Sequence, residues 1–143
     1  MRYGLSAWQE WGKTVRLDGR VDQWHDQDRR AGTTWDVRLA LRDLLYDRGE
    51  VALSIYDTDG VFTSGLGGRI GLNRYFSRGF VSVAYDLAGY RFAADPGDSL
   101  QHGFHGTVDY DLSATTAVSL STDYWFGDRQ NSFGLGLFLQ KRF

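Results

Sequence analysis

The feature that most constrains this chain is a two-residue alternation of apolar with small or polar side chains. It is clearest between residues 133 and 143, which read Phe-Gly-Leu-Gly-Leu-Phe-Leu-Gln-Lys-Arg-Phe. Successive side chains of a β-strand point to opposite faces, so a period of two is the period of a strand with one apolar face. A tilted strand of about 9–11 residues is also long enough to cross a bilayer. The C-terminal segment is therefore predicted to be a strand of membrane-spanning length.

The same alternation marks eight earlier segments, so the chain is predicted to be all-β. Residues 36–46 are rich in Leu and Arg and could also form a short helix, but their period-two division is cleaner than their helical one. The predicted strands are residues 3–11, 15–22, 35–42, 51–56, 66–73, 81–88, 106–112, 118–126 and 133–143.

The connections between these segments alternate in length. Short connections are predicted at residues 12–13, 47–49, 77–79 and 113–116, and longer polar ones at 25–32, 58–64, 93–103 and 127–131. Short turns at one end and longer loops at the other are typical of an antiparallel up-and-down barrel in a membrane. We therefore expect one antiparallel up-and-down transmembrane β-barrel domain over residues 1–143, with about eight or nine strands.

Composition agrees with a sheet protein and excludes several functions. Aromatic residues make up 15% of the chain, and there are 18 Gly but a single Pro. The mean hydropathy of -0.40 does not argue against a membrane barrel, because alternating residues cancel in the average. No apolar run is long enough for a transmembrane helix. A net charge of -2 without a basic block argues against nucleic acid, and the absence of Cys excludes thiol chemistry.

The alternating C-terminal segment that ends in Phe143 resembles the closing strand of bacterial outer-membrane β-barrels. Many members carry a second aromatic residue two positions before the end, where this chain has Lys141. The resemblance is to small OmpA-like barrels, or to the C-terminal strands of a larger barrel. It implies a location in the outer membrane of a Gram-negative bacterium, with the lipid bilayer and the outer-membrane assembly machinery as partners. It also implies that Phe143 is the assembly signal.

The two faces of the predicted strands differ sharply in chemistry. In a membrane barrel the charged face would line the lumen, where Arg and Asp must pair because an isolated buried charge is costly. The apolar face would meet lipid. The predicted lumenal network comprises Arg16, Asp18, Arg20, Asp22, Asp36, Arg38, Arg42, Arg69, Asp86, Asp109, Asp111 and Asp123. The predicted lipid-facing residues include Val81, Val83, Val108, Val118, Leu120, Leu135, Leu137 and Leu139.

Three local patterns offer weaker hints of chemistry. His102 and His105, followed by Asp109 and Asp111, contain metal-ligand residue types, although His102 is expected in a loop. Residues 57–60, Asp-Thr-Asp-Gly, resemble the opening of a calcium loop without its later ligands. His105, Asp109 and Ser113 contain the groups of a nucleophile relay, without a supporting motif. We expect no catalytic residue, no metal and no cofactor.

The sequence favours a non-enzymatic outer-membrane barrel, acting as a structural barrel, a small porin-like channel or the terminal part of an export pore. One alternative is a barrel enzyme that acts on lipid or peptide at the outer leaflet. Another is a soluble β-barrel that binds a small ligand, in which case the apolar face would point inward. A bacterial barrel has an even number of strands, so a count of nine leaves open whether residues 3–11 span or whether the chain is part of a larger barrel. The oligomeric state is also open.

Overall fold

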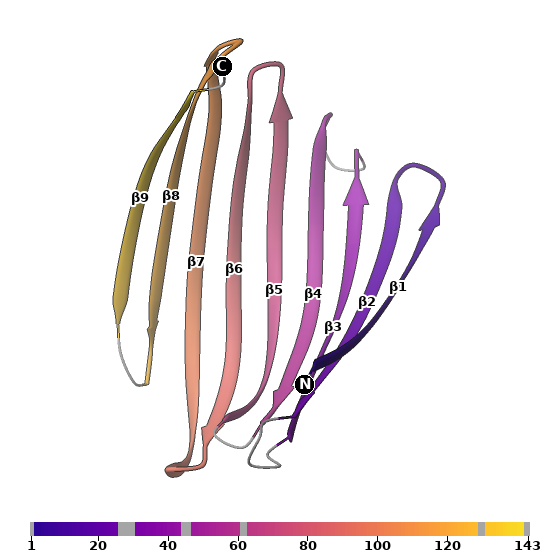
Figure 1. Ribbon diagram of the computed structural model, residues 1–143, viewed down its shortest axis with the longest axis vertical. Coiled ribbons are helices and arrows are strands. Elements are labelled where there is room, and N and C mark those ends of the chain that lie inside the picture. Colours follow the sequence, from indigo (N-terminus) through magenta and orange to yellow (C-terminus); the bar gives the residue numbers. More distant parts are fainter. Residues whose placement is uncertain (1, 26–30, 44–46, 61–62, 129–130, 142–143) are drawn as a thin grey trace.

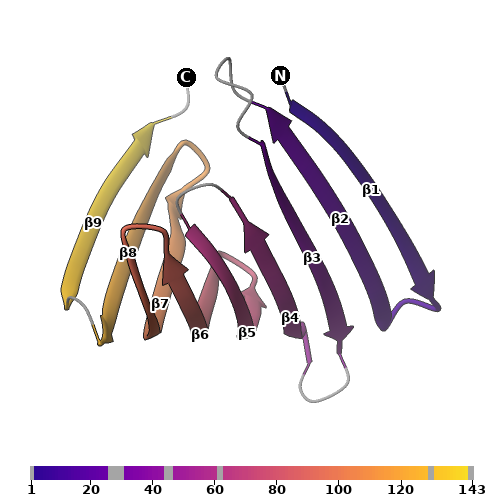
Figure 2. The same ribbon diagram turned by 90° about the horizontal axis from the view of Figure 1, so that it is seen from below.

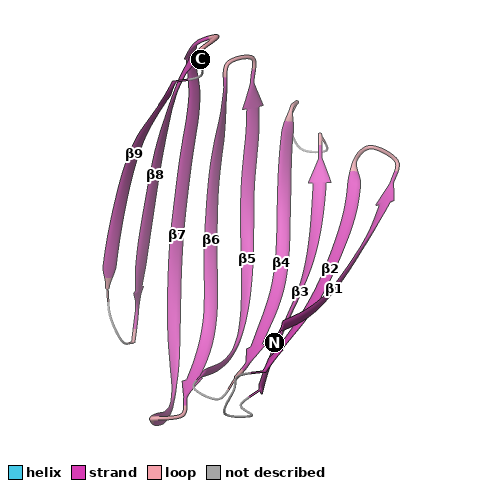
Figure 3. Ribbon diagram, viewed as in Figure 1, coloured by secondary structure: helices cyan, strands magenta, loops and turns pink. Residues whose placement is uncertain are grey.

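The chain folds into a single sheet without helices in the residues described (Figures 1 and 3). The computed structural model describes residues 2–25, 31–43, 47–60, 63–128 and 131–141, apart from the side chains of residues 95 and 96. Its strands are β1 (Arg2–Trp11), β2 (Val15–His25), β3 (Ala31–Arg42), β4 (Gly49–Asp59), β5 (Thr63–Phe76), β6 (Gly79–Phe92), β7 (Asp95–Ser113), β8 (Thr116–Gly127) and β9 (Ser132–Lys141).

Each strand pairs antiparallel with the next one along the chain, in the order β1 to β9. This confirms the all-β, up-and-down architecture predicted from the alternation. The sheet is strongly curved, and Figure 2 shows it as an open arch with β1 and β9 as its two rims. Among the described residues neither β1 nor β9 has a partner on its outer edge, so the sheet is not closed into a barrel.

Two local predictions are corrected by the strand bounds. Residues 36–42 belong to β3, so the helical alternative for this segment is wrong as far as it is described. The long loop predicted at 93–103 is also wrong, because β7 already begins at Asp95 and pairs with β6 through contacts such as Tyr90 with Ser99. The residues between 95 and 103 alternate weakly, and their extended conformation is fixed by pairing with the neighbouring strand.

The strand register places all the predicted network charges on one face of the sheet. One row of register partners runs across five strands and contains Asp18, Arg38, Ser54, Arg69 and Asp86. We call this face the polar face and the opposite one the apolar face. Antiparallel partners lie side by side on one face, so each row brings together residues far apart in sequence.

The distribution of buried and exposed side chains is the reverse of that in a water-soluble protein: several charged side chains are buried and most large apolar ones are exposed. Asp86 on the polar face is fully buried, with 0% of its surface exposed, and Asp22 and Glu50 are also buried. On the apolar face, Leu135, Leu137 and Leu139 are 68–72% exposed. The few buried apolar residues are small or peripheral, such as Ala40 and Ala88. Within the described part of the chain, no helix is long and apolar enough to cross a membrane.

Candidate functional site

The candidate site is the polar face, and its most buried part is centred on Asp86 of β6. Arg69 Nε, from β5, lies 2.8 Å and 2.9 Å from the two carboxylate oxygens of Asp86. His105 of β7 approaches from the other side, with Nε2 2.9 Å from Asp86 Oδ2 at an angle that does not form a hydrogen bond. Its Nδ1 lies 2.6 Å from Oδ1 of Asp123 on β8. Arg69, Asp86, His105 and Asp123 therefore form a continuous row of ionisable side chains across four strands.

Three aromatic rings on the polar face lie near this row of side chains, and each ring lies against a glycine on a neighbouring strand. Trp125 packs edge-on against His105, with ring centroids 5.0 Å apart, and faces Gly103. A Cβ atom at Gly103 would lie 2.9 Å from Cζ3 of Trp125, which is closer than real Cβ contacts allow. The same relationship holds for Tyr56 with Gly67 and for Tyr90 with Gly65, as direct register partners. Glycine here provides the space that the rings occupy.

A second cluster is centred on Glu50, at the start of β4. Its Oε1 accepts hydrogen bonds from Arg38 Nη2 at 2.6 Å and Asn73 Nδ2 at 3.2 Å, and its Oε2 accepts one from Arg42 Nε at 3.3 Å. Ser82 Oγ, one strand further on, donates to Asn73 Oδ1 at 2.7 Å. The buried carboxylate is thus satisfied by two cations and an amide from the strands on either side of it.

The ion pairs continue to the edge strand β1. Glu10 lies 3.5 Å from Arg42 Nη1 and 3.6 Å from Arg16 Nη1, and Arg16 also pairs with Asp18 at 2.6 Å. Positive and negative groups alternate along this part of the polar face.

A separate pair of contacts holds Asp22 at the other end of β1 and β2. Arg2 Nη2 lies 3.3 Å from Asp22 Oδ2, and Arg20 Nε lies 2.5 Å from the same atom. Asp36 is the register partner of Arg20 on β3. Every predicted network residue on β2 and β3 therefore lies beside at least one residue of opposite charge.

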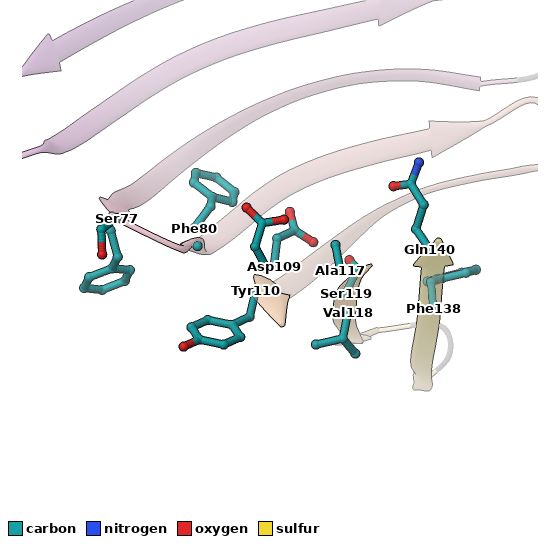
Figure 4. Close-up of a pocket in the computed structure, with 12 residues that line it drawn as sticks. Ser77, Phe80, Asp109, Tyr110, Ala117, Val118, Ser119, Phe138 and Gln140 are labelled. Atoms are coloured by element: carbon teal, nitrogen blue, oxygen red, sulfur yellow. The ribbon is translucent and has the colours of Figure 1, made fainter. Parts of the chain in front are cut away.

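Asp109 and Asp111 lie apart from these clusters, near the β5–β6 and β7–β8 turns. They line a pocket of about 540 Å³ together with Phe80, Phe138 and Gln140. Figure 4 shows Asp109 and Gln140 pointing to one side of the sheet and Tyr110 and Val118 to the other. The lining residues thus belong to both faces, and the pocket does not bring polar groups together around one point.

The three weaker chemical hints are not supported by the geometry. His102 lies in β7, not in a loop, and faces away from His105, because its Nδ1 is 2.7 Å from Tyr85 OH on the apolar face. Ser113 lies eight residues beyond His105 on the same strand, which is about 26 Å at 3.3 Å per residue. Residues 57–59 belong to β4. The described residues contain no group of three or more His, Cys, Asp or Glu side chains that could hold a metal ion.

The sequence prediction missed several members of the polar face. Four residues were not assigned to the network, although each lies on the polar face of its strand, in the same alternation as the predicted charges: Glu10, Glu50, Asn73 and His105. Glu50 lies two residues before Ala52, so continuing the two-residue alternation toward the N-terminus of the strand would have placed Glu50 on the polar face.

The predicted lipid-facing residues share the apolar face. Val83, Val108, Leu120 and the three leucines of β9 are exposed, whereas Val81 and Val118 are half-buried. Six of the eight have a register partner within the same set, for example Val81 with Val108 and Leu120 with Leu137. Phe143, the predicted assembly signal, lies outside the described residues.

Comparison with known proteins adds no relative: no family model, no curated protein and no solved structure matches this chain.

Proposed function

We propose that this chain is a non-enzymatic bacterial outer-membrane β-barrel protein whose apolar face contacts lipid and whose polar face lines a cross-linked lumen. The observation that carries the proposal is the inverted burial. Every strand carries apolar side chains on the exposed face, while the predicted network charges and the buried Glu50 lie on the opposite, more buried face.

The size of the exposed apolar surface argues against a water-soluble protein. Leaving one Val, Leu, Ile or Phe side chain in water rather than burying it costs about 1.5–3 kcal/mol. Leu53, Ile70, Val83 and Leu120, on four different strands, are all more than 40% exposed, as are most large residues of this face. A soluble ligand-binding barrel would place these residues inside. The hydrocarbon of a bilayer provides the environment that this face requires.

The polar face favours a structural barrel over an enzyme or a wide pore. Its buried carboxylates are already bound by cations, as in the Arg69–Asp86 and Arg38–Glu50 pairs. His105 is held between two carboxylates, and no hydroxyl group is hydrogen-bonded to either ring nitrogen among the described residues. Such a lumen is cross-linked by side chains and does not present an activated nucleophile.

The proposal is tested by asking which face meets lipid. The chain has no Cys, so a single introduced thiol can carry a fluorophore. Leu120 and Ser121 are neighbours on β8 with opposite faces, so Leu120→Cys and Ser121→Cys are a matched pair. After refolding into vesicles that contain brominated lipid, we expect strong quenching at position 120 and weak quenching at 121. Equal quenching at both positions, or folding that needs neither detergent nor lipid, would overturn the proposal.

A further inference from the structure

The apolar face carries charged strand residues only at its two ends. The turn end is the end of the sheet with the β1–β2, β5–β6 and β7–β8 turns, at the top of Figure 1, and there the charged residues are Arg74 of β5 and Lys141 of β9. At the opposite end, the loop end, they are Asp57, Asp59, Arg91 and Asp98. Between these positions the described strands place no Asp, Glu, Lys or Arg on this face. The apolar band is therefore bounded by cations at one end and mainly by carboxylates at the other.

Three arginines gather where β5 reaches the turn end. Arg74 is the register partner of Gly49, and the carbonyl oxygen of the preceding residue, Arg48, accepts a hydrogen bond of 2.9 Å from Tyr75 N. Arg78 lies in the turn that follows β5. Backbone pairing therefore holds Arg48, Arg74 and Arg78 at the same end of neighbouring strands, and we call them the arginine cluster.

The arginine cluster differs from the other described arginines in its ion pairs. Arg91 pairs with Asp98 at 2.9 Å, and every described arginine of the polar face is paired with a carboxylate: Arg2, Arg16, Arg20, Arg38, Arg42 and Arg69. Arg48 and Arg78 form no ion pair with any residue that the structure describes. Carboxylates do occur nearby along the chain, but none of them lies within ion-pair distance of a described arginine: Asp43, Asp47 and Asp111.

The guanidinium of Arg74 is directed toward the turn end. Its Cζ lies 5.4 Å from the ring centre of Phe76, which is two residues nearer to the end of β5. Phe76 is itself 50% exposed on the apolar face. A long cationic side chain that bends out of an apolar band, beside an aromatic ring, places its charge at the level of lipid headgroups.

An apolar groove begins directly beside Arg74, on the side away from the turn. It has a volume of about 350 Å³ and is lined by Arg74, Leu72, Val81 and Val83, together with Asn73. Val81 is the register partner of Arg74, and Leu72 is that of Val83. Leu72 and Val83 are 47% and 51% exposed, so the groove opens along the apolar face. A cationic end followed by an apolar groove matches a lipid with an anionic headgroup and a hydrocarbon chain.

We propose that the arginine cluster binds the headgroup phosphate of an anionic phospholipid, whose acyl chain lies in the groove beside Arg74. The inference rests on the proposed function, since lipid must surround the apolar face. Guanidinium groups suit this ligand because they bind phosphate oxygens through two parallel N–H bonds. Asp57 and Asp59 at the loop end would repel the same headgroup, so binding is confined to one leaflet.

The test measures which lipid lies beside each end of the apolar face. A single fluorophore is attached at Tyr110→Cys or at Leu66→Cys, two exposed positions on this face. Tyr110 lies beside the β5–β6 turn, since Asp111 N donates to Arg78 O at 2.7 Å, whereas Leu66 is the register partner of Asp57. Each protein is refolded into vesicles of phosphatidylglycerol and phosphatidylcholine with the same composition in both leaflets. Either the anionic or the zwitterionic lipid is brominated, and its mole fraction is varied.

We expect brominated phosphatidylglycerol to quench position 110 at a lower mole fraction than brominated phosphatidylcholine does, with no such preference at position 66. Arg74→Gln should raise the half-quenching mole fraction of phosphatidylglycerol at position 110 roughly fivefold, the effect of one cation near an anionic surface. Replacing Arg48, Arg74 and Arg78 together by Gln should abolish the preference. Arg91→Gln, at the loop end, is the matched control and should leave it unchanged. Quenching at position 66 in the triple variant shows that this variant still enters the bilayer.

Equal preference for phosphatidylglycerol at positions 110 and 66 overturns the proposal, as does a preference that survives the triple substitution. Loss of the preference on addition of inorganic phosphate at constant ionic strength would show a site for the free anion, and it also overturns the proposal. Absence of quenching by both brominated lipids at both positions would instead refute the proposed function, because the apolar face would then not meet lipid.

Discussion

The ring of Tyr56 lies across the backbone of Gly67, its direct register partner on the next strand, so closely that a Cβ atom at position 67 would collide with it. Three other pairs on the polar face repeat this relationship: Tyr90 with Gly65, Trp125 with Gly103 and Trp24 with Gly32. Glycine inside a strand usually weakens it, and one accepted reason for its presence is the close approach of another group. In this sheet the approaching group is a ring that covers the neighbouring strand.

Gly67→Ala is therefore expected to destabilise the protein by about 1–3 kcal/mol, the usual cost of overpacking. The matched control is Gly68→Ala, one residue along β5 on the apolar face, where the nearest atom to an added Cβ is Ser54 O at an ordinary 3.6 Å. Urea unfolding in detergent measures both variants. Equal losses at 67 and 68 would show that backbone propensity, and not the ring of Tyr56, sets the requirement for glycine.

The Arg69–Asp86 pair is expected to respond asymmetrically to substitution. Removing one partner of a fully buried ion pair costs about 3–5 kcal/mol. Asp86 is buried whereas the Arg69 side chain is 48% exposed, so solvent screening reduces this loss, and we expect about 2 kcal/mol for Arg69→Met. Asp86→Asn should cost less, since Arg69 can turn toward solvent.

Arg91→Met removes the exposed Arg91–Asp98 pair and serves as the control, with little expected effect on the free energy of unfolding. A larger loss for Asp86→Asn than for Arg69→Met would contradict this reasoning.

Val83 lies on the inner strand β6 and is 51% exposed on the apolar face. If this face meets lipid, Val83→Arg should cost about 2–4 kcal/mol, the penalty for Arg near the bilayer midplane. Asp98 is exposed and lies near the start of β7, so Asp98→Arg should change the free energy of unfolding far less. The measurement is reversible unfolding from vesicles. Similar losses at the two positions would be incompatible with a lipid-facing Val83.

Most of the strands could be predicted from sequence because they have one continuous apolar face, and period two then follows from strand geometry alone. What the alternation could not provide is register. The partners of Glu50 are Arg38, Arg42 and Asn73, which lie 8–23 residues away along the chain. Their convergence depends on how β3, β4 and β5 align.

The start of β7 was missed for a related reason. Leu100 is its only large apolar residue between 95 and 103, so the local pattern resembles a loop. Pairing with β6 nevertheless continues through Gln101 with Ala88 and Ser99 with Tyr90. An extended partner can impose strand conformation on a segment that has little propensity of its own.

The hydrogen bond between Tyr85 OH and His102 Nδ1, 2.7 Å long, provides a test of the surroundings of the apolar face. In hydrocarbon, losing the hydroxyl leaves a ring nitrogen without a partner, so Tyr85→Phe should cost about 1–3 kcal/mol. In water the imidazole would simply be solvated and the change would be small.

The double variant Tyr85→Phe with His102→Phe is the control. Phe126 stacks on His102 at 4.8 Å and Phe104 packs against Tyr85, so the double variant keeps an aromatic surface. We expect this second substitution to restore most of the lost stability in vesicles. A double variant as unstable as the single one would show that the cost lies in packing, and not in an unpaired polar group facing lipid.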